Sequence, residues 1–215
     1  DMGTMVFGDG AAGGFGIDAV KNFVPGADTP AYTLGFTDAA YVGGAGTTGN
    51  LAYQLAVGDT GIVVGAEQEV DSAGGYSRSM SIKFSDADLG FDVGVGTSEL
   101  APDNGDGGNT ETAIGASYTA GAFKVGANHN STDYGSTTND IDYQGYGVSY
   151  AVNDDLTISY QVVTNSRDTA AQDEQISQVA ASYSMGSISF SGYVGKQSDV
   201  SGTAGSDDAE KHISM

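Results

Sequence analysis

Cysteine and tryptophan are absent from this chain of 215 residues, and proline occurs only 3 times. The absence of cysteine excludes disulfides, cysteine-ligated zinc or iron–sulfur sites, and any thiol nucleophile. Basic residues are also scarce, because 7 lysines and arginines stand against 28 aspartates and glutamates, which gives a formal net charge of −21. So negative a protein repels the phosphates of nucleic acids, and no nucleic-acid partner is expected.

Long apolar runs are missing as well. No stretch approaches the roughly 18 uninterrupted apolar residues that a transmembrane helix needs, so a helical membrane protein is excluded. The composition is instead rich in glycine, with 34 residues, and holds 12 tyrosines and 8 phenylalanines. These residues favour strands and tight turns. Strands of a membrane β-barrel alternate apolar with polar residues, so a weak hydropathy average is compatible with that fold.

Alternation with a period of two is the main pattern of the chain. About a dozen short segments alternate apolar with small or polar residues, and turn residues end each one. The clearest segments are 80–84, 89–97, 156–162 and 187–194. The polar face is mostly glycine and serine, which suits a curved wall around a lumen better than the solvated face of a soluble sandwich. A serine-rich soluble barrel or sandwich stays open as an alternative.

The connections between these segments fall into two classes that alternate along the chain. Short turns are predicted at 58–59, 86–88, 120–121, 152–155 and 185–186, and long polar loops at 71–76, 98–110, 131–140, 165–173 and 196–209. This alternation is typical of an up-and-down barrel in the outer membrane, with tight periplasmic turns and larger external loops. Aromatic residues on the apolar face precede four of the short turns, and we interpret them as a girdle at the periplasmic interface. They are Phe84, Tyr118, Tyr150 and Tyr183.

One stretch breaks the pattern. Residues 10–48 form a long connection between a strand at 3–9 and the next at 50–57. A loop of that length in a compact protein is usually functional or disordered. Its apolar residues, which include Ile17, Val20 and Phe23, argue against disorder, so the stretch is expected to pack against other parts of the protein.

At this point the chain resembles the general porins of alphaproteobacteria, of the Rhodobacter type. The resemblance rests on Thr4-Met5-Val6-Phe7-Gly8-Asp9 at the end of a strand, on the Gly/Ala-rich stretch after it, and on Gly35-Phe36-Thr37-Asp38 near the end of that stretch. Paired strands then continue to residue 215. Together these features cover nearly the whole chain.

The resemblance implies a transmembrane antiparallel up-and-down β-barrel of sixteen strands, a homotrimer, and a constriction loop, here 10–48, that folds into the lumen. It implies an outer-membrane location among lipid and lipopolysaccharide, passive diffusion of small hydrophilic solutes, no cofactor and no enzymatic activity. On this alignment residues 1–215 are a single barrel domain with about twelve strands represented. About four N-terminal strands and the extreme C-terminus are then expected to be missing.

Charged residues of such a pore can be assigned on the same basis. In the constriction loop, Asp18, Lys21, Asp28 and Asp38 are candidates for one side of a transverse field. By strand parity Glu67, Glu69, Lys83, Asp92 and Lys124 are expected to line the lumen. The negative net charge favours a weak preference for cations, unless most of that charge lies in external loops, where it only solvates.

Two short motifs point to functions other than a channel. Asp103-Asn104-Gly105-Asp106 is a candidate for weak Ca²⁺ binding in an acidic loop, although its spacing does not match an EF-hand. Residues 13–21 loosely match a single copy of a Ca²⁺-binding β-roll repeat, a fold that needs several copies. A secreted acidic adhesin or a β-roll or β-sandwich module is therefore the alternative function. Catalysis has little support, because neither His129 nor His212 has a nucleophile in a recognised spacing.

Overall fold

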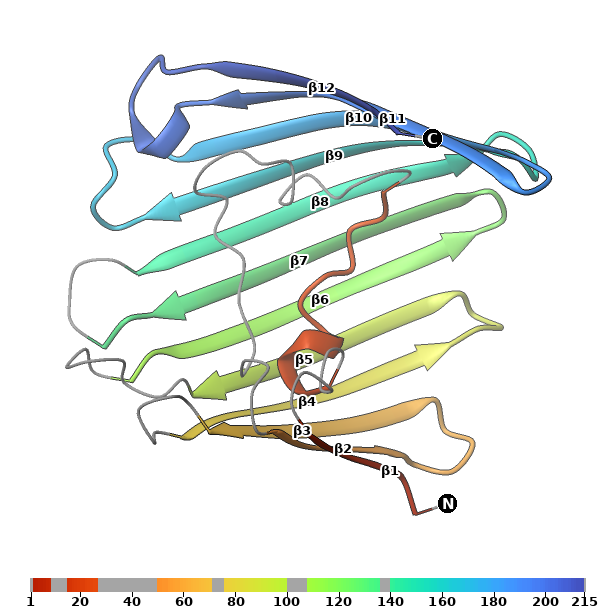
Figure 1. Cartoon of the computed structure of the whole chain (residues 1–215), viewed down its shortest axis with the longest axis vertical. Helices are drawn as coiled ribbons and strands as arrows, with labels where there is room; N and C mark the ends of the chain where they lie inside the picture. The colour runs from red at the N-terminus through yellow and green to blue at the C-terminus, as the bar shows by residue number, and fades with distance from the viewer. Residues whose placement is uncertain are drawn as a thin grey trace.

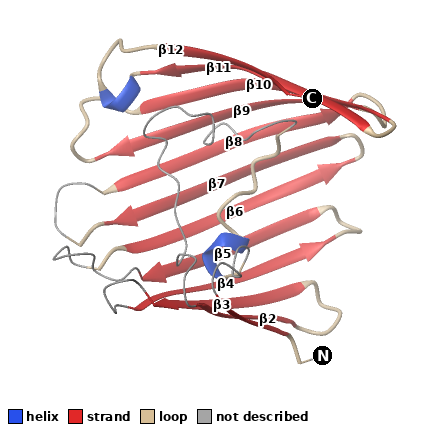
Figure 2. Ribbon diagram, viewed as in Figure 1, coloured by secondary structure: helices blue, strands red, loops and turns tan. Residues whose placement is uncertain are grey.

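The computed structural model describes residues 2–8, 15–26, 50–70, 76–99, 108–135 and 140–214. Strands make up most of this part of the chain, and its helices are two short 3-10 segments (Figure 2). No helix among these residues has the length and apolar character to cross a membrane. The strands are β1 (Thr4–Gly8), β2 (Asn50–Ala56), β3 (Ile62–Val70), β4 (Tyr76–Asp86), β5 (Phe91–Glu99), β6 (Thr110–Ala120), β7 (Phe123–Asp133), β8 (Ile141–Ala151), β9 (Leu156–Arg167), β10 (Glu174–Met185), β11 (Ile188–Ser198) and β12 (Asp208–Ser214), with the 3-10 helices η1 (Gly16–Ala19) and η3 (Val200–Gly202).

The twelve strands form one sheet in the order of the sequence, from β1 to β12. Every strand pairs antiparallel with the strand that follows it. The sheet is curved, and residues 15–26 lie in front of its middle strands (Figure 1). The predicted all-β, antiparallel up-and-down fold is therefore confirmed, as is the estimate of about twelve strands.

Tight turns join the strands at one end of the sheet. Gly58, Gly121 and Gly186 lie in three of these turns with positive φ angles of 56°, 59° and 61°, which glycine adopts at little cost. In two others a side chain caps the turn, because Asp86 Oδ1 accepts hydrogen bonds from the backbone N–H groups of Asp88 and Leu89, and Asn153 Oδ1 does the same further along. We call this end the short-turn end and the opposite one the loop end.

Strand boundaries differ from the sequence prediction by a few residues. β5 begins at Phe91 rather than at residue 89, because Leu89 belongs to the turn that Asp86 caps. β9 and β11 continue to Arg167 and Ser198, past the predicted loop starts at 165 and 196. Ladder hydrogen bonds to the neighbouring strand set where a strand ends, and they form whether or not the side chains still alternate.

The two faces of the sheet have opposite chemistry. On the outer face large apolar side chains are exposed, among them Met80 at 60 %, Val179 at 57 % and Val194 at 56 %. The inner face, on which residues 15–26 lie, buries polar side chains such as Asn130 and Gln161. A soluble protein exposes few large apolar patches of this kind. The sheet is thus apolar outside and polar inside, as the alternation of the sequence indicated.

Candidate functional site

Residues 15–26 cross the inner face of the sheet from η1 toward β8 (Figure 1). At the start of this segment the backbone N–H of Ile17 donates a hydrogen bond to Ser79 Oγ on β4. Further along, Asn130 Nδ2 on β7 donates to the Lys21 carbonyl oxygen at 2.9 Å. We call residues 15–26 the inward segment. It is the described part of the 10–48 connection that was expected to fold inward.

Apolar side chains of the inward segment form a small core against the wall. Ile17 and Val20 are fully buried, Phe23 is 7 % exposed, and all three cluster with Ala113 of β6. The expectation that this stretch packs against the rest of the protein is met for these residues. Burial of such side chains stabilises the segment by about 1.5–3 kcal/mol each in the usual area accounting.

Glycines of the wall make this close approach possible. A Cβ atom at Gly94 would lie 2.5 Å from Val20 Cγ1, and one at Gly115 would overlap the Phe23 ring. Gly126 faces the Phe23 carbonyl in the same way, and Gly145 and Gly147 face Val24. The glycines of the polar face therefore leave the space in which the inward segment packs against the wall. Sequence reasoning had assigned them only to a lumen-facing surface.

The charged residues expected in the constriction loop are partly described. Asp18 Oδ1 and Lys21 Nζ lie 2.8 Å apart and form an ion pair within the inward segment. The two charges therefore offset each other. Asp28 and Asp38 lie outside the described residues.

Three of the predicted lumen-lining residues gather on the inner face at the short-turn side of the inward segment. Lys83 Nζ lies 4.0 Å from Asp92 Oδ1 and 5.6 Å from the centre of the Phe23 ring. Asp92 also accepts hydrogen bonds from Ser85 Oγ at 2.6 Å and Ser117 Oγ at 3.3 Å. Lys124 lies near enough to act on the Asp92 carboxylate electrostatically. Their exposure to a lumen stays a prediction.

The glutamates of β3 have a different setting. Glu67 is only 5 % exposed, and it lies beneath the inward segment at Gly16. It is thus on the predicted face but covered. Glu69 belongs to the same strand, and its side chain is outside the described part of the structure.

Two further carboxylates, which the sequence placed only in or beside loops, are buried on the inner face. Glu111 accepts a hydrogen bond from Ser98 Oγ at 2.7 Å. Glu174 accepts from the side-chain amides of Asn165 and Gln197 and from the backbone N–H of Ser201. Alternation alone places both glutamates on the polar face, but the partners that bury them come from neighbouring strands and from η3. A charge count therefore overstates the charge that this wall offers to a solute.

The aromatic residues predicted as a girdle all lie on the outer face near the short-turn end. Their cross-strand neighbours extend the row, because Tyr118 pairs with Phe91, Tyr150 with Phe123 and Tyr183 with Phe190. The Phe123 and Tyr150 rings have centroids 4.5 Å apart. Sequence reasoning missed the three phenylalanines because they follow the turns instead of preceding them. The role of the row at a membrane interface stays a prediction.

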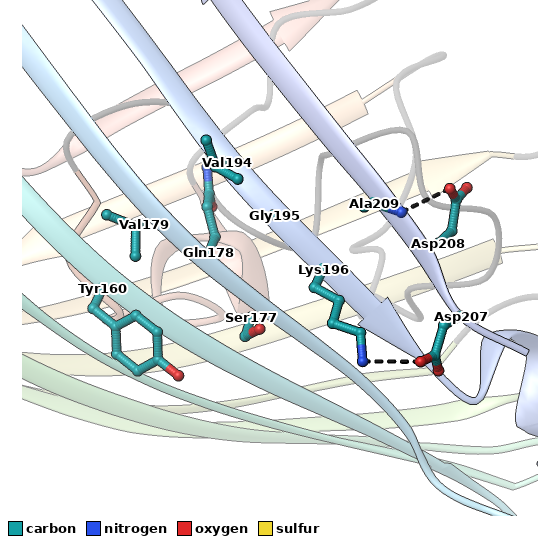
Figure 3. Close-up of a pocket in the computed structure, with 10 residues that line it drawn as sticks. All are labelled: Tyr160, Ser177, Gln178, Val179, Val194, Gly195, Lys196, Asp207, Asp208 and Ala209. Atoms are coloured by element: carbon teal, nitrogen blue, oxygen red, sulfur yellow. Dashed lines mark hydrogen bonds and ion pairs between the residues drawn. The ribbon is translucent and has the colours of Figure 1, made fainter. Parts of the chain in front are cut away.

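A groove of about 500 Å³ lies on the outer face between β9 and β12 (Figure 3). Tyr160, Val179 and Val194 give it an apolar side. At its rim Lys196 Nζ pairs with Asp207 Oδ2 at 2.9 Å, and this hydrogen bond holds the pKa of the Asp207 carboxyl below its ordinary value. The groove thus combines an apolar surface with a charge that is already paired.

The described residues contain no arrangement of side chains that is typical of a catalytic site or a metal site. His129 Nε2 lies 3.6 Å from Asp142 Oδ1 on the outer face, and the hydroxyl of Ser131, the residue opposite Asp142, is hydrogen-bonded to Thr112 Oγ1 at 2.7 Å. The described residues include no group of three or more histidine, aspartate or glutamate side chains placed to hold a metal ion. The acidic stretch 103–106 lies outside these residues. Calcium binding there stays a prediction.

Comparisons with known proteins agree with a sheet that is apolar on its outer face and polar on its inner face. Residues 3–214 match the model of a family described as Gram-negative porin. No protein of curated function gives a significant sequence match.

Among solved structures, an anion-selective porin from Comamonas acidovorans is similar with a TM-score of 0.63 at 12 % identity, over 78 % of this chain and 60 % of that one. The trimer form of OmpT, an outer membrane protein of Vibrio cholerae, has a TM-score of 0.62 at 15 % identity, over 99 % of this chain and 73 % of that one. At such identities the likeness concerns the fold. The chain spans less than two thirds of the length of the Comamonas protein.

Proposed function

This chain belongs to the Gram-negative porin family, and we propose that it forms the wall of a water-filled channel for passive diffusion of small hydrophilic solutes and ions. It is a protein of the outer membrane. The observation that carries the proposal is the reversed distribution of side chains. Large apolar groups are exposed on the outer face, while serine, asparagine and glutamine side chains are buried on the inner one.

This distribution fits lipid on one side and water on the other. A transmembrane barrel needs an apolar band on its outside and a polar interior. Leu51, Ile82 and Ile158, each more than 40 % exposed, would face water in a soluble protein. The adhesin and soluble sandwich alternatives do not account for this exposure.

The inward segment gives the channel its proposed narrow point. It lies across the inner wall and is fixed there by packing, by the hydrogen bond that the Ile17 N–H donates to Ser79 Oγ, and by the one that Asn130 Nδ2 donates to the Lys21 carbonyl oxygen. Solutes would pass between it and the opposite wall. Closure of the curved sheet into a sixteen-stranded barrel is part of the proposal, as is membership of the alphaproteobacterial subgroup.

A homotrimer is proposed as the assembly. Support comes from the Vibrio cholerae relative of the same fold, which is described in a trimer form. Outer-membrane lipid and lipopolysaccharide are the proposed surroundings of the outer face. No cofactor is needed, because diffusion through a polar lumen involves no covalent chemistry.

We further propose a weak preference for cations. The formal net charge of −21 favours cations near the mouths of a pore. The preference is weak because the inner-face glutamates Glu67, Glu111 and Glu174 are at most 5 % exposed, so they contribute little to the field that a passing ion meets.

Planar-bilayer recording of the purified native protein tests the proposal. We expect stepwise ohmic openings, and in a salt gradient a reversal potential of the sign that marks cation preference. Protein that inserts in folded form and never conducts would contradict the channel. Conducting protein with a reversal potential of the opposite sign would contradict the cation preference alone.

A further inference from the structure

The cluster of Lys83, Asp92 and Lys124 departs from the charge balance of the whole chain. These residues lie on three neighbouring or near-neighbouring strands, β4, β5 and β7. The register places them on one face. Lys83 pairs with Gly94, which is two residues from Asp92 on β5, and Asp92 pairs with Ser117. Ser117 is two residues from Thr119, which pairs with Lys124, and residues two apart on a strand share a face. This is the face on which the inward segment lies. We refer to the three residues as the lysine cluster.

The lysine cluster lies next to the inward segment, on the side of the short-turn end. Phe23 of the inward segment packs over Gly94 and Gly115, which neighbour Asp92 and Ser117 along their strands. Lys83 contacts the Phe23 ring at 5.6 Å. Between the inward segment and the short-turn end, the described strands carry charged side chains on the inner face at these three positions.

The carboxylate of the lysine cluster is engaged on its wall side. Ser85 Oγ and Ser117 Oγ donate to its two oxygens at 2.6 Å and 3.3 Å. Lys83 Nζ, at 4.0 Å, is well beyond the roughly 2.8 Å of a charge-assisted hydrogen bond. Lys124 acts on Asp92 electrostatically and forms no ion pair within 4.0 Å of a carboxylate among the described residues. Both ammonium groups therefore keep donors for another partner.

The local charge is positive. Two ammonium groups and one carboxylate leave a balance of +1, and the side chains of Lys83 and Asp92 are 35 % and 30 % exposed. The other described acids of the inner wall near this level are buried, and Asp18 is paired with Lys21. An anion that has passed the inward segment would thus meet cations first.

We propose that Lys83 and Lys124 form a weak binding subsite for anionic solutes that carry a carboxylate or phosphate group. The inference rests on the proposed channel and adds a solute class to it. Asp92 attracts the two lysines and, by its own charge, keeps the affinity for an anion low. Conduction requires binding that is weak enough for release, so this arrangement suits passage and not storage.

The test compares the removal of two charges from the inner face of the sheet with the removal of two charges from its outer face. Lys83→Gln with Lys124→Gln removes two inner charges, and Lys196→Gln with Lys211→Gln removes two charges from outer-face positions of β11 and β12. Reversal potentials are measured in bilayers under gradients of potassium chloride and of potassium phosphate. We expect the inner variant to raise the ratio of cation to anion permeability by about three- to tenfold, as Coulomb energies at such distances in water imply. The outer variant should change it little.

Two further variants guard against a folding artefact. Lys83→Arg with Lys124→Arg keeps the charge and should keep the wild-type ratio, whereas Asp92→Asn should lower it. Equal shifts in the inner and outer variants, or no shift in the inner one, would overturn the subsite while leaving the channel intact. Wild-type protein that opens no channels would overturn both the subsite and the proposed function.

Discussion

At the scale of single residues, the packing of the inner wall depends on glycines, which have no side chain. Gly94, Gly115 and Gly126 lie where any Cβ atom would meet Val20 or Phe23 of the inward segment. Because protein interiors are packed to near crystalline density, one added methyl group at such a contact must displace its neighbour. These glycines therefore determine how close the inward segment lies to the wall.

Gly115→Ala tests this contact. The added methyl group would overlap the Phe23 ring and lie 3.0 Å from the Ala127 carbonyl oxygen, so we expect the free energy of unfolding to fall. A decrease of about 1–3 kcal/mol is typical of overpacking. The temperature at which the folded form is lost in gel mobility, together with urea unfolding, gives the measurement.

Ala181→Val is the matched control, because it adds methyl groups at an exposed position of β10. Phe23→Leu combined with Gly115→Ala should recover part of the lost stability, since a smaller side chain relieves the overlap. Equal stability of Gly115→Ala and the wild type would show that the inward segment does not rest on this glycine.

At the scale of elements, the inward segment and the strands beneath it behave as one packed unit. Its backbone is bound to β4 through Ser79 and to β7 through Asn130, and its apolar side chains fill the space between. An element held by contacts to several strands is expected to stay fixed while solutes pass. Only such an element can define a constant pore width.

A disulfide between the inward segment and β5 tests whether it is fixed. The chain has no cysteine, so Val20→Cys with Gly94→Cys introduces a single possible pair. A Cβ at position 94 would lie 3.0 Å from Val20 Cβ, so the inward segment must shift outward by about 0.5–1 Å to reach the roughly 3.5–4.5 Å that disulfides span. We expect rapid cross-linking under mild oxidation, read as a mobility shift after proteolysis between the two positions, with little change in conductance.

Val20→Cys with Val95→Cys provides the negative control, because Val95 has its side chain on the outer face, 47 % exposed. That pair should not cross-link. A large change of conductance on cross-linking of positions 20 and 94 would indicate instead that the inward segment moves during conduction.

At the scale of the whole molecule, the aromatic row of the outer face marks one border of the apolar surface. Tyr118, Tyr183 and Phe190 are 47 %, 40 % and 39 % exposed, and all lie near the short-turn end. Amphipathic rings of this kind favour the boundary between the headgroups and the hydrocarbon of a bilayer. The row thus predicts how deep the molecule lies in the membrane.

Tyr183→Trp tests the predicted depth, since the chain contains no other tryptophan. In bilayers its fluorescence should be quenched more by lipids brominated near the headgroup than by lipids brominated at the chain ends. Tyr193→Trp, on the inner face where Tyr193 is 7 % exposed, should escape quenching by either lipid. A tryptophan at position 183 that no brominated lipid quenches would contradict the girdle.

Many features of the fold can be predicted from local patterns in the sequence. Alternation along 80–84 or 156–162 depends only on the two-residue period of a strand, and turn residues such as Gly121 and Asn153 act on their own backbone. The sequence alone therefore determined the strands, their order, the short turns, and which residues share a face with Lys83 and Tyr118. It also indicated that residues 10–48 contain a packed segment.

Other properties depend on contacts between residues distant in the chain, and only the tertiary structure decided them. Ile17 and Ser79 are 62 positions apart, and Lys21 and Asn130 are 109 apart, so no local pattern relates them. Parity placed Glu67 and Asp92 on one face alike, but the inward segment covers Glu67, whereas Asp92 stays partly exposed beside Lys83. Burial and pairing are properties of the assembled wall, because the atoms that remove water from a carboxylate come from other strands.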